Sequence, residues 1–135
     1  MIVFTCVADN MGTMFNKRRV SKDKLLRERM FSLLGENKLF TSPYGAKQFD
    51  EEEKERLNIS DTFLEEAGEG DFCFSEDGQI KTFEDKIEKL IVYRWNRDYP
   101  ADTFLDVELS CRKLESTYEF AGKSHEKITE EVYEK

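Results

Sequence analysis

The sequence predicts one α/β domain of three layers, in which a mixed β-sheet carries helices on both faces. The chain of 135 residues has the length of a single domain that spans residues 1–135. Strand patterns and helix patterns alternate through its first half, as in sheets whose parallel strands are joined by helices. Two later segments, 112–120 and 127–133, show rough alternation of apolar and polar residues and predict a C-terminal antiparallel hairpin.

The N-terminal part is expected to form a buried strand, a loop and a helix. Residues 2–8 are apolar and β-branched and are followed by turn residues, which predicts a buried strand. Residues 12–20 are assigned to a loop. Ser21 is a suitable N-cap for a helix with apolar residues at helical spacing, and Gly35 is expected to end that helix.

The middle of the chain is expected to alternate short helices with short strands. A proline after Ser42 occupies the first helical position of one short helix, and Ser60 or Asp61 caps a second. The expected elements are a strand over 38–41, a short helix over 44–49, a charged surface segment over 50–56, a short helix through 63–67, strands over 71–75 and 89–95, a helical turn over 83–87 and an extended segment over 102–107.

Charge and cysteine content bound the class of protein. The net charge is −8, from 21 basic and 29 acidic residues, and a field of that sign disfavours nonspecific contact with nucleic acid or an anionic membrane. Cys6, Cys73 and Cys111 are far apart and odd in number, which indicates reduced free thiols. Together with an N-terminus that lacks the pattern of a signal peptide or a membrane span, reduced thiols predict a cytoplasmic protein.

Motifs for the common cofactors are absent from the sequence. It contains neither a GxGxxG nor a Walker A motif, and it has one histidine. A phosphate-binding glycine loop or a zinc site with several histidines therefore cannot be built in the usual way. A Ser-His-Asp triad would have to use His125, which we expect to be an exposed turn residue. The sequence thus predicts no cofactor and no metal, and its motifs identify no catalytic residue.

Four strings resemble a group of short bacterial proteins without an assigned role. The strings are NMGTMFNKRR, YRWNRDYPAD, EFAGKSHEKIT and the terminal EEVYEK. Some members of the group carry the label ribonuclease Z, an activity that implies a two-zinc site built from many histidines. A chain with one histidine cannot supply that site. The chain therefore resembles the group, but the resemblance does not imply ribonuclease activity.

The two ends of the chain also resemble the dihydrofolate reductase family. The start, with VADN, a glycine-bearing loop and a helix that opens SKDKLLRE, is similar to the reductase start, and EKLIVYRWNRDYPADTFLDV resembles a later strand and acidic segment. The resemblance implies a trimmed reductase-like fold and makes Asp23 the candidate substrate-binding carboxylate. The family's proline-tryptophan pair, cofactor-phosphate turn and adjacent glycines are missing, so the resemblance does not extend to hydride transfer from a nicotinamide cofactor.

The region 17–29 is basic within an acidic chain. It has seven basic residues and two acids, Asp23 and Glu28, so its local charge is +5. One interpretation is a patch for a phosphate, an RNA backbone or an acidic partner; the other is a solvated helix face whose Arg27 and Arg29 pair with acids elsewhere. The candidate binding residues in and beside this region are Met14, Phe15, Lys17, Arg18 and Arg19.

The segment 93–106 holds the only tryptophan of the chain. Arg94, Trp95 and Arg97 are candidate anchors for a partner, because tryptophan and arginine are frequent at binding hot spots. The alternative is a corner of the sheet, in which Tyr93 and Trp95 pack on one face. In that case the two arginines are expected to pair with Asp98, Asp102 or Asp106.

Together these observations predict a small binding or interaction domain without catalytic activity, whose main contact surface is the loop 11–19 with the start of the following helix. Its expected partner is another protein, or a second copy of the chain if the terminal strand leaves an open sheet edge. A divergent reductase-like or nucleotide-binding enzyme that uses Asp23 is the first alternative. An RNA-associated protein that uses the 17–29 patch is the second.

Overall fold

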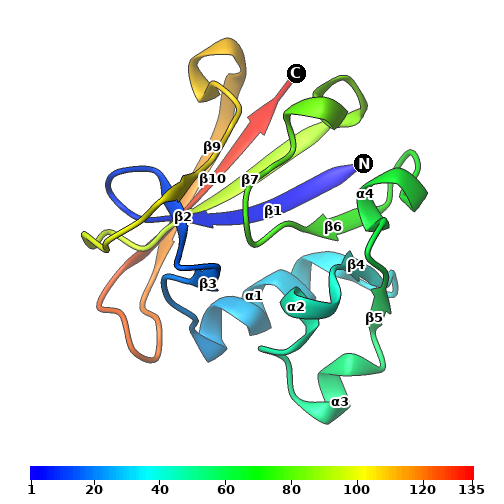
Figure 1. Ribbon diagram of the computed structural model, residues 1–135, viewed down its shortest axis with the longest axis horizontal. Helices are drawn as coiled ribbons and strands as arrows, with labels where there is room; N and C mark the ends of the chain where they lie inside the picture. The colour runs from blue at the N-terminus through cyan, green and yellow to red at the C-terminus, as the bar shows by residue number, and fades with distance from the viewer.

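The computed structural model describes residues 1–135 and places seven strands in one mixed sheet (Figure 1). β1 (Ile2–Val7) lies inside the sheet, parallel to β6 (Phe72–Phe74) on one side and to β7 (Lys89–Arg94) on the other. From edge to edge the order is β5 (Leu57–Ile59), β4 (Leu39–Thr41), β6, β1, β7, β10 (Ile128–Glu134) and β9 (Lys113–Phe120). β4 and β5 continue the parallel part, whereas β10 and β9 are antiparallel. The predicted α/β fold with a mixed sheet and a C-terminal hairpin is confirmed.

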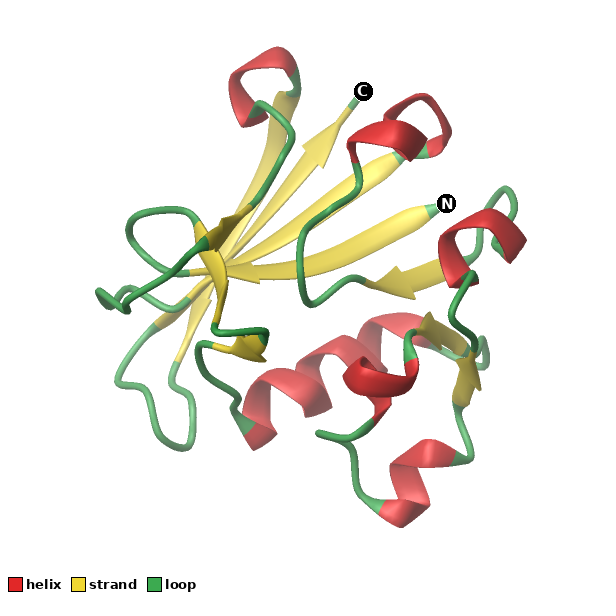
Figure 2. Cartoon of the chain, in the orientation of Figure 1, coloured by secondary structure: helices red, strands yellow, loops and turns green.

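The helices are short, apart from α1 (Lys24–Leu34). The others are α2 (Pro43–Ala46), α3 (Glu51–Lys54), α4 (Phe63–Glu66) and the 3₁₀ turns η1 (Lys81–Lys86) and η2 (Leu109–Cys111) (Figure 2). None of these helices combines the length and the hydrophobicity that a membrane crossing requires.

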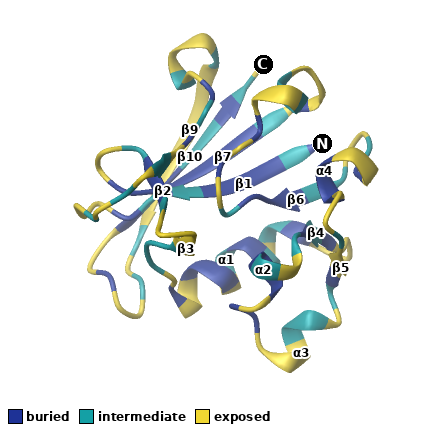
Figure 3. Cartoon of the chain, viewed as in Figure 1, coloured by how far each residue is buried: buried dark blue, intermediate teal, exposed yellow.

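The core lies on both faces of the sheet, because successive side chains of a strand point to opposite faces. One cluster of 13 buried residues joins Phe4 and Tyr93 of the sheet to Leu26 of α1. The opposite cluster of 14 buried residues joins Val3 and Val92 to α4 and to the residues that flank η1. Helical segments therefore cover both faces, as predicted, and burial is concentrated in β1 and β7 (Figure 3).

The segment expected to be a loop before α1 forms a hairpin instead. β2 (Gly12–Phe15) pairs with β3 (Arg18–Arg19) and, on its other side, with β8 (Thr103–Phe104), which gives a separate three-stranded sheet. Asn16 and Lys17 form the turn with φ values of 55° and 63°, as a type I′ hairpin requires. The strands are too short to show alternation, and the partner β8 is distant in sequence.

Three further expectations are corrected by the structure. Asp23, not Ser21, caps α1, because its Oδ1 accepts hydrogen bonds from the N–H groups of Leu25 and Leu26 at 2.9 and 3.4 Å. β5 was not expected, since Leu57 is the only buried residue in that strand. The terminal strand β10 is not an edge, because β9 pairs with its free side and is itself the exposed edge (Figure 3).

Candidate functional site

The β2–β3 hairpin brings together most of the residues expected to bind a partner. Phe15 pairs with Arg18, and Met14 pairs with Arg19, across the two strands. Phe15 is 46% exposed, and Lys17 and Arg18 are exposed beside it. Neither of these two cations forms an ion pair. The hairpin therefore presents an apolar ring flanked by uncompensated positive charge.

Two clefts border the hairpin on different sides. The smaller cleft, of about 310 Å³, lies against Met14 and Lys17. The larger, of about 550 Å³, lies against the other side of the hairpin and reaches the segment that follows β7. Its lining includes Phe15, Arg18, Val20, Tyr99 and Pro100.

Arg19 anchors the hairpin to the rest of the domain. Its Nε and Nη2 donate to the two carboxylate oxygens of Glu76 at 2.7 and 3.0 Å, and Nη2 also donates to the carbonyl of Tyr44 at 3.1 Å. The guanidinium carbon lies 4.5 Å from the centre of the Tyr44 ring. Arg19 was a candidate binding residue, but these contacts occupy its side chain.

Two arginines of the basic region are neutralised by glutamates from other elements. Arg27 lies 3.5 Å from Glu53, and Arg29 lies 2.8 Å from Glu130. For these two residues the interpretation of a helix face with paired arginines is correct. Glu130 also contacts a buried residue, because the hydroxyl of Tyr93 donates to it at 2.8 Å.

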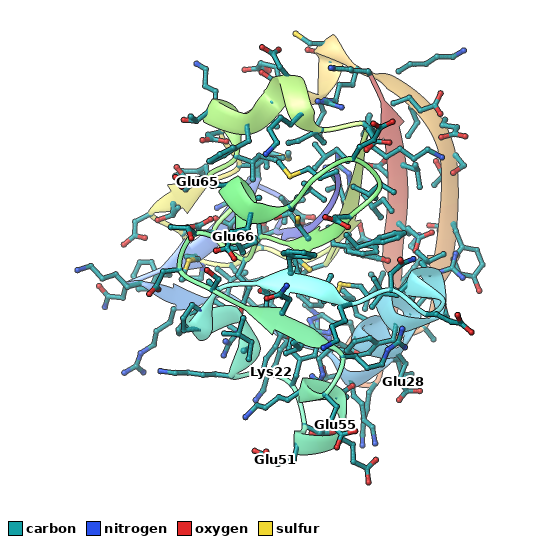
Figure 4. The ribbon with its side chains drawn as sticks, turned by 90° about the vertical axis from the view of Figure 1, so that its right-hand side faces the viewer. Lys22, Glu28, Glu51, Glu55, Glu65 and Glu66 are labelled. Atoms are coloured by element: carbon teal, nitrogen blue, oxygen red, sulfur yellow. The ribbon has the colours of Figure 1, made fainter.

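Free positive charge remains on the hairpin and at the start of α1. Lys22 and Lys24 are exposed and form no ion pair, like Lys17 and Arg18. The short helix α3 and its C-cap carry the opposite charge: Glu51 and Glu55 extend into solvent at the lower edge of the view in Figure 4. The positive surface is therefore local, on a chain with a net charge of −8.

The carboxylate of Asp23 is buried and accepts hydrogen bonds on both oxygens. In addition to the helix N–H groups, Oδ1 accepts the N–H of Lys123 at 3.0 Å, and Oδ2 accepts the N–H and the hydroxyl of Ser124 at 2.9 and 3.1 Å. Oδ2 also lies 3.0 Å from Nδ1 of His125. Gly122 permits this close approach, since a Cβ there would lie 2.6 Å from Oδ2.

His125, expected to be an exposed turn residue, is 4% exposed, so that expectation is wrong. Its ring stacks on Trp95 with 4.5 Å between the ring centres and 26° between the planes. Its Nε2 lies 3.0 Å from Oγ of Ser21 and 3.1 Å from the hydroxyl of Tyr99. We call Ser21, Asp23, Tyr99 and His125 the histidine cluster.

The hydrogen bonds of the histidine cluster have a defined direction. An ionised carboxylate only accepts hydrogen bonds, so Nδ1 of a neutral His125 carries the proton that it shares with Asp23. Nε2 is then the acceptor and receives a hydroxyl proton from Ser21 or Tyr99. The hydroxyl of Tyr99 can also donate to Oγ of Ser21, at 3.4 Å.

The electrostatics of Asp23 follow from the same contacts. Burial by itself would raise the pKa of this carboxyl, but the hydrogen bonds from Lys123, His125 and Ser124 outweigh it and hold the pKa well below its usual range. Each oxygen already accepts three hydrogen bonds. The reductase resemblance implies that this carboxylate binds a substrate. Both oxygens of Asp23 are occupied by hydrogen bonds within the chain, so neither is free for a ligand.

The candidate anchors Arg94, Trp95 and Arg97 lie at a corner of the sheet. Trp95 is 3% exposed and belongs to the core cluster that includes α1. Arg94 pairs with Glu131 at 2.5 Å, and Arg97 donates to the carbonyl of Ser124 at 3.1 Å. The acids expected to pair with these arginines make no such contact, and the expectation is wrong for Asp98, Asp102 and Asp106.

The three cysteines are free, as expected. Burial raises the pKa of Cys73 to about 12 and also raises that of Cys6 well above its usual value. Both thiols therefore stay protonated at neutral pH, and neither is a ready nucleophile.

No protein-family model matches the chain, and no curated protein matches it either. Functional proposals therefore rest on the hairpin, its two clefts and the histidine cluster. Sequence reasoning missed this cluster, because Ser21 and His125 are 104 residues apart and no local pattern links them. The one available signal was Asp23, which the reductase resemblance had selected for a different role.

Proposed function

We propose that this chain is a binding domain that contacts an acidic protein partner through the β2–β3 hairpin. One observation carries the proposal: Phe15 is exposed opposite Arg18 and beside the turn that carries Lys17, and neither cation has a carboxylate partner. Lys22 and Lys24 add further unpaired charge at the start of α1. An acidic segment with an apolar side chain would be steered by the cations and would bury the ring.

A protein partner is favoured over RNA by the way the basic residues are used. Arg19, Arg27 and Arg29 are held by glutamates, so about half of the basic region has no charge to offer to a phosphate backbone. The remaining cations flank a single exposed aromatic ring, Phe15, rather than a row of stacking platforms.

The proposal includes a trimmed dihydrofolate reductase-like fold and a cytoplasmic location. A central strand whose last residue, Val7, begins the string VADN, a following helix capped by Asp23 and a closing hairpin support the fold. The free thiols support the location.

Selection of displayed 12-residue peptides on the immobilised chain tests this function. Enrichment of peptides rich in aspartate and glutamate with one aromatic or aliphatic residue is expected. In solution, the double variant Lys17→Glu/Arg18→Glu should weaken the selected peptide at least tenfold, because it reverses the two charges beside Phe15.

The matched control is Lys38→Glu/Lys113→Glu, which changes the net charge equally. Both lysines are exposed and form no ion pair. Lys38 precedes β4, and Lys113 begins β9. Both therefore lie at the end of the sheet where β7 begins, and the hairpin lies at the opposite end. This control should bind the peptide almost as the unmodified chain does. Equal loss in both double variants would reduce the effect to net charge and contradict a site at the hairpin.

A further inference from the structure

The histidine cluster holds a hydroxyl, an imidazole and a carboxylate in the order that serine hydrolases use. Oγ of Ser21 lies 3.0 Å from Nε2 of His125, and Nδ1 of the same ring lies 3.0 Å from Oδ2 of Asp23. Such a constellation is recognised by its geometry and roles, since it recurs on unrelated folds with different chain orders. We propose that Ser21 is a nucleophile that accepts an acyl group, with His125 as its general base.

The surroundings hold the imidazole in the orientation that this role needs. Asp23 is a positioning residue: its carboxylate is fixed by backbone N–H groups from α1 and from the turn before β10. Trp95 covers one face of the His125 ring. The proton on Nδ1 leaves Nε2 free to accept a hydroxyl proton, and in the proposed role Ser21 donates it and the ring is the base.

The histidine cluster lies beside the larger of the two clefts, which Tyr99 lines. Ser21 is half-buried, and its neighbours Val20 and Tyr99 line that cleft of about 550 Å³. Ser21 itself lines an adjoining enclosed cavity of about 10 Å³, which shares Arg19 and Val20 with the cleft. Phe15 and Arg18 line the same cleft, which offers an apolar wall and one cation to a substrate. These features fit a small ester whose acyl part carries an apolar group and a carboxylate. The hydroxyl of Tyr99 is a second hydrogen-bond donor beside this nucleophile, 3.4 Å from Oγ of Ser21.

The reaction balances without a metal, an oxidant or a further cofactor. Oγ of Ser21 attacks the ester carbonyl while its proton moves to Nε2 of His125. The tetrahedral intermediate then collapses, the C–O bond to the alcohol breaks, and the same proton passes from Nε2 to the departing alkoxide. Water adds to the acyl-serine by the same steps, with His125 taking its proton, and releases the acid and free Ser21.

This inference goes beyond the binding function proposed above, and the two can fail separately. The partner contact is tested by charge reversal at Lys17 and Arg18, which leaves Ser21 in place. The acyl transfer is tested by reactions of Ser21 in the absence of any peptide. Loss of peptide binding with intact labelling of Ser21, or the reverse, separates them.

A fluorophosphonate probe tests the nucleophile directly, since Oγ displaces fluoride from phosphorus while His125 takes the proton. Digestion after glutamate gives a peptide of residues 1–28, in which Ser21 is the only serine. We expect the mass of one phosphonyl group on this peptide, and no label on it in Ser21→Ala. The exposed Ser116 in β9 provides the matched control, because Ser116→Ala should be labelled like the unmodified chain.

The role of the base is tested by the rate of the same labelling. His125→Gln should slow it by a factor of about 100 or more, as for loss of a general base. Should that variant fail to fold, the unmodified chain in urea serves instead, because an unfolded Ser21 has no base and should lose the label. Two results would overturn the proposal: no label on residues 1–28 of the folded chain, or equal labelling of these residues in the folded and unfolded chains.

Discussion

The hairpin and the histidine cluster are neighbours in sequence and differ in almost every physical respect. The hairpin ends at Arg19, and the cluster begins at Ser21. In the hairpin, Phe15, Lys17 and Arg18 are exposed, and the two cations have no ionic partner. In the cluster, each polar side chain has a hydrogen-bond partner, and Asp23 is 3% exposed.

The difference shows that one region holds the chain in place through paired buried groups, whereas the other presents unpaired charge at the surface. Buried polar groups must be paired, because a buried unpaired group costs the full loss of its hydration. The cluster therefore fixes the chain where α1 begins, with Asp23 joining the helix to the turn at Lys123. Exposed cations carry no such requirement, so the hairpin is free to present charge to a partner.

The largest expected effect is on stability, from truncation inside the cluster. Asp23→Ala removes the acceptor for two helix N–H groups, two turn N–H groups and His125, and should lower the free energy of unfolding by about 3 kcal/mol. Urea unfolding measures it. Asp50→Ala, at the exposed start of α3, should cost about 1 kcal/mol or less. Similar costs for the two aspartates would remove the distinction between the regions.

Acid should weaken the histidine cluster by protonating the carboxylate of Asp23. The carboxyl pKa of Asp23 is lower in the folded chain than in the unfolded chain, so the unfolded chain binds more protons. The stabilisation by Asp23 is complete above the unfolded pKa of about 3.9 and is lost as the pH falls through the folded value. Urea midpoints between about pH 6 and pH 2.5 should fall less steeply in Asp23→Asn. Parallel profiles would show that Asp23 contributes no pH dependence.

A smaller steric effect is expected at the turn that meets Asp23. Gly122→Ala places a Cβ 2.6 Å from Oδ2 of Asp23 and 2.8 Å from Cδ1 of Ile128, which should cost about 2 kcal/mol in thermal unfolding. Gly68→Ala is the matched control, since the nearest atom would be 3.8 Å away, and its cost should be close to zero. A tolerated alanine at Gly122 would mean that the turn does not approach Asp23.

The smallest expected effect on stability is in the hairpin. Phe15→Ala and Lys17→Glu should each change the free energy of unfolding by no more than about 0.5 kcal/mol, because these side chains are exposed. The same variants should weaken the binding of a selected acidic peptide. Arg19→Ala should be more costly than either, since it leaves Glu76 without its partner. A large loss of stability in Phe15→Ala would show that its ring is part of the core.

Long apolar runs made the sheet predictable, whereas pairing between distant segments did not. The strands around Phe4 and Val92 are buried on both faces, so the sequence pattern alone identifies them. The β2–β3 hairpin depends on β8, and its turn contains no glycine to mark it. Arg94 finds its partner across the sheet at Glu131 rather than among the nearby aspartates. Only tertiary packing brings such groups together.

The same reason explains what was missed in the candidate site. The sequence selected the exposed residues Phe15, Lys17 and Arg18 from composition, and the structure places them in one hairpin. His125 is in a polar turn whose pattern is that of a surface loop, yet its ring is buried against Trp95 and Asp23. A pattern of single residues cannot reveal an approach between backbone segments.

The most direct measurement is the ¹⁵N spectrum of the imidazole of His125, which is unambiguous because the chain has one histidine. It should be recorded at about pH 8. A neutral ring with its proton on Nδ1 and an unprotonated Nε2 is the result expected from the contacts with Asp23 and Ser21. A proton on Nε2, or a mixture of the two tautomers in fast exchange, would contradict the ordered histidine cluster.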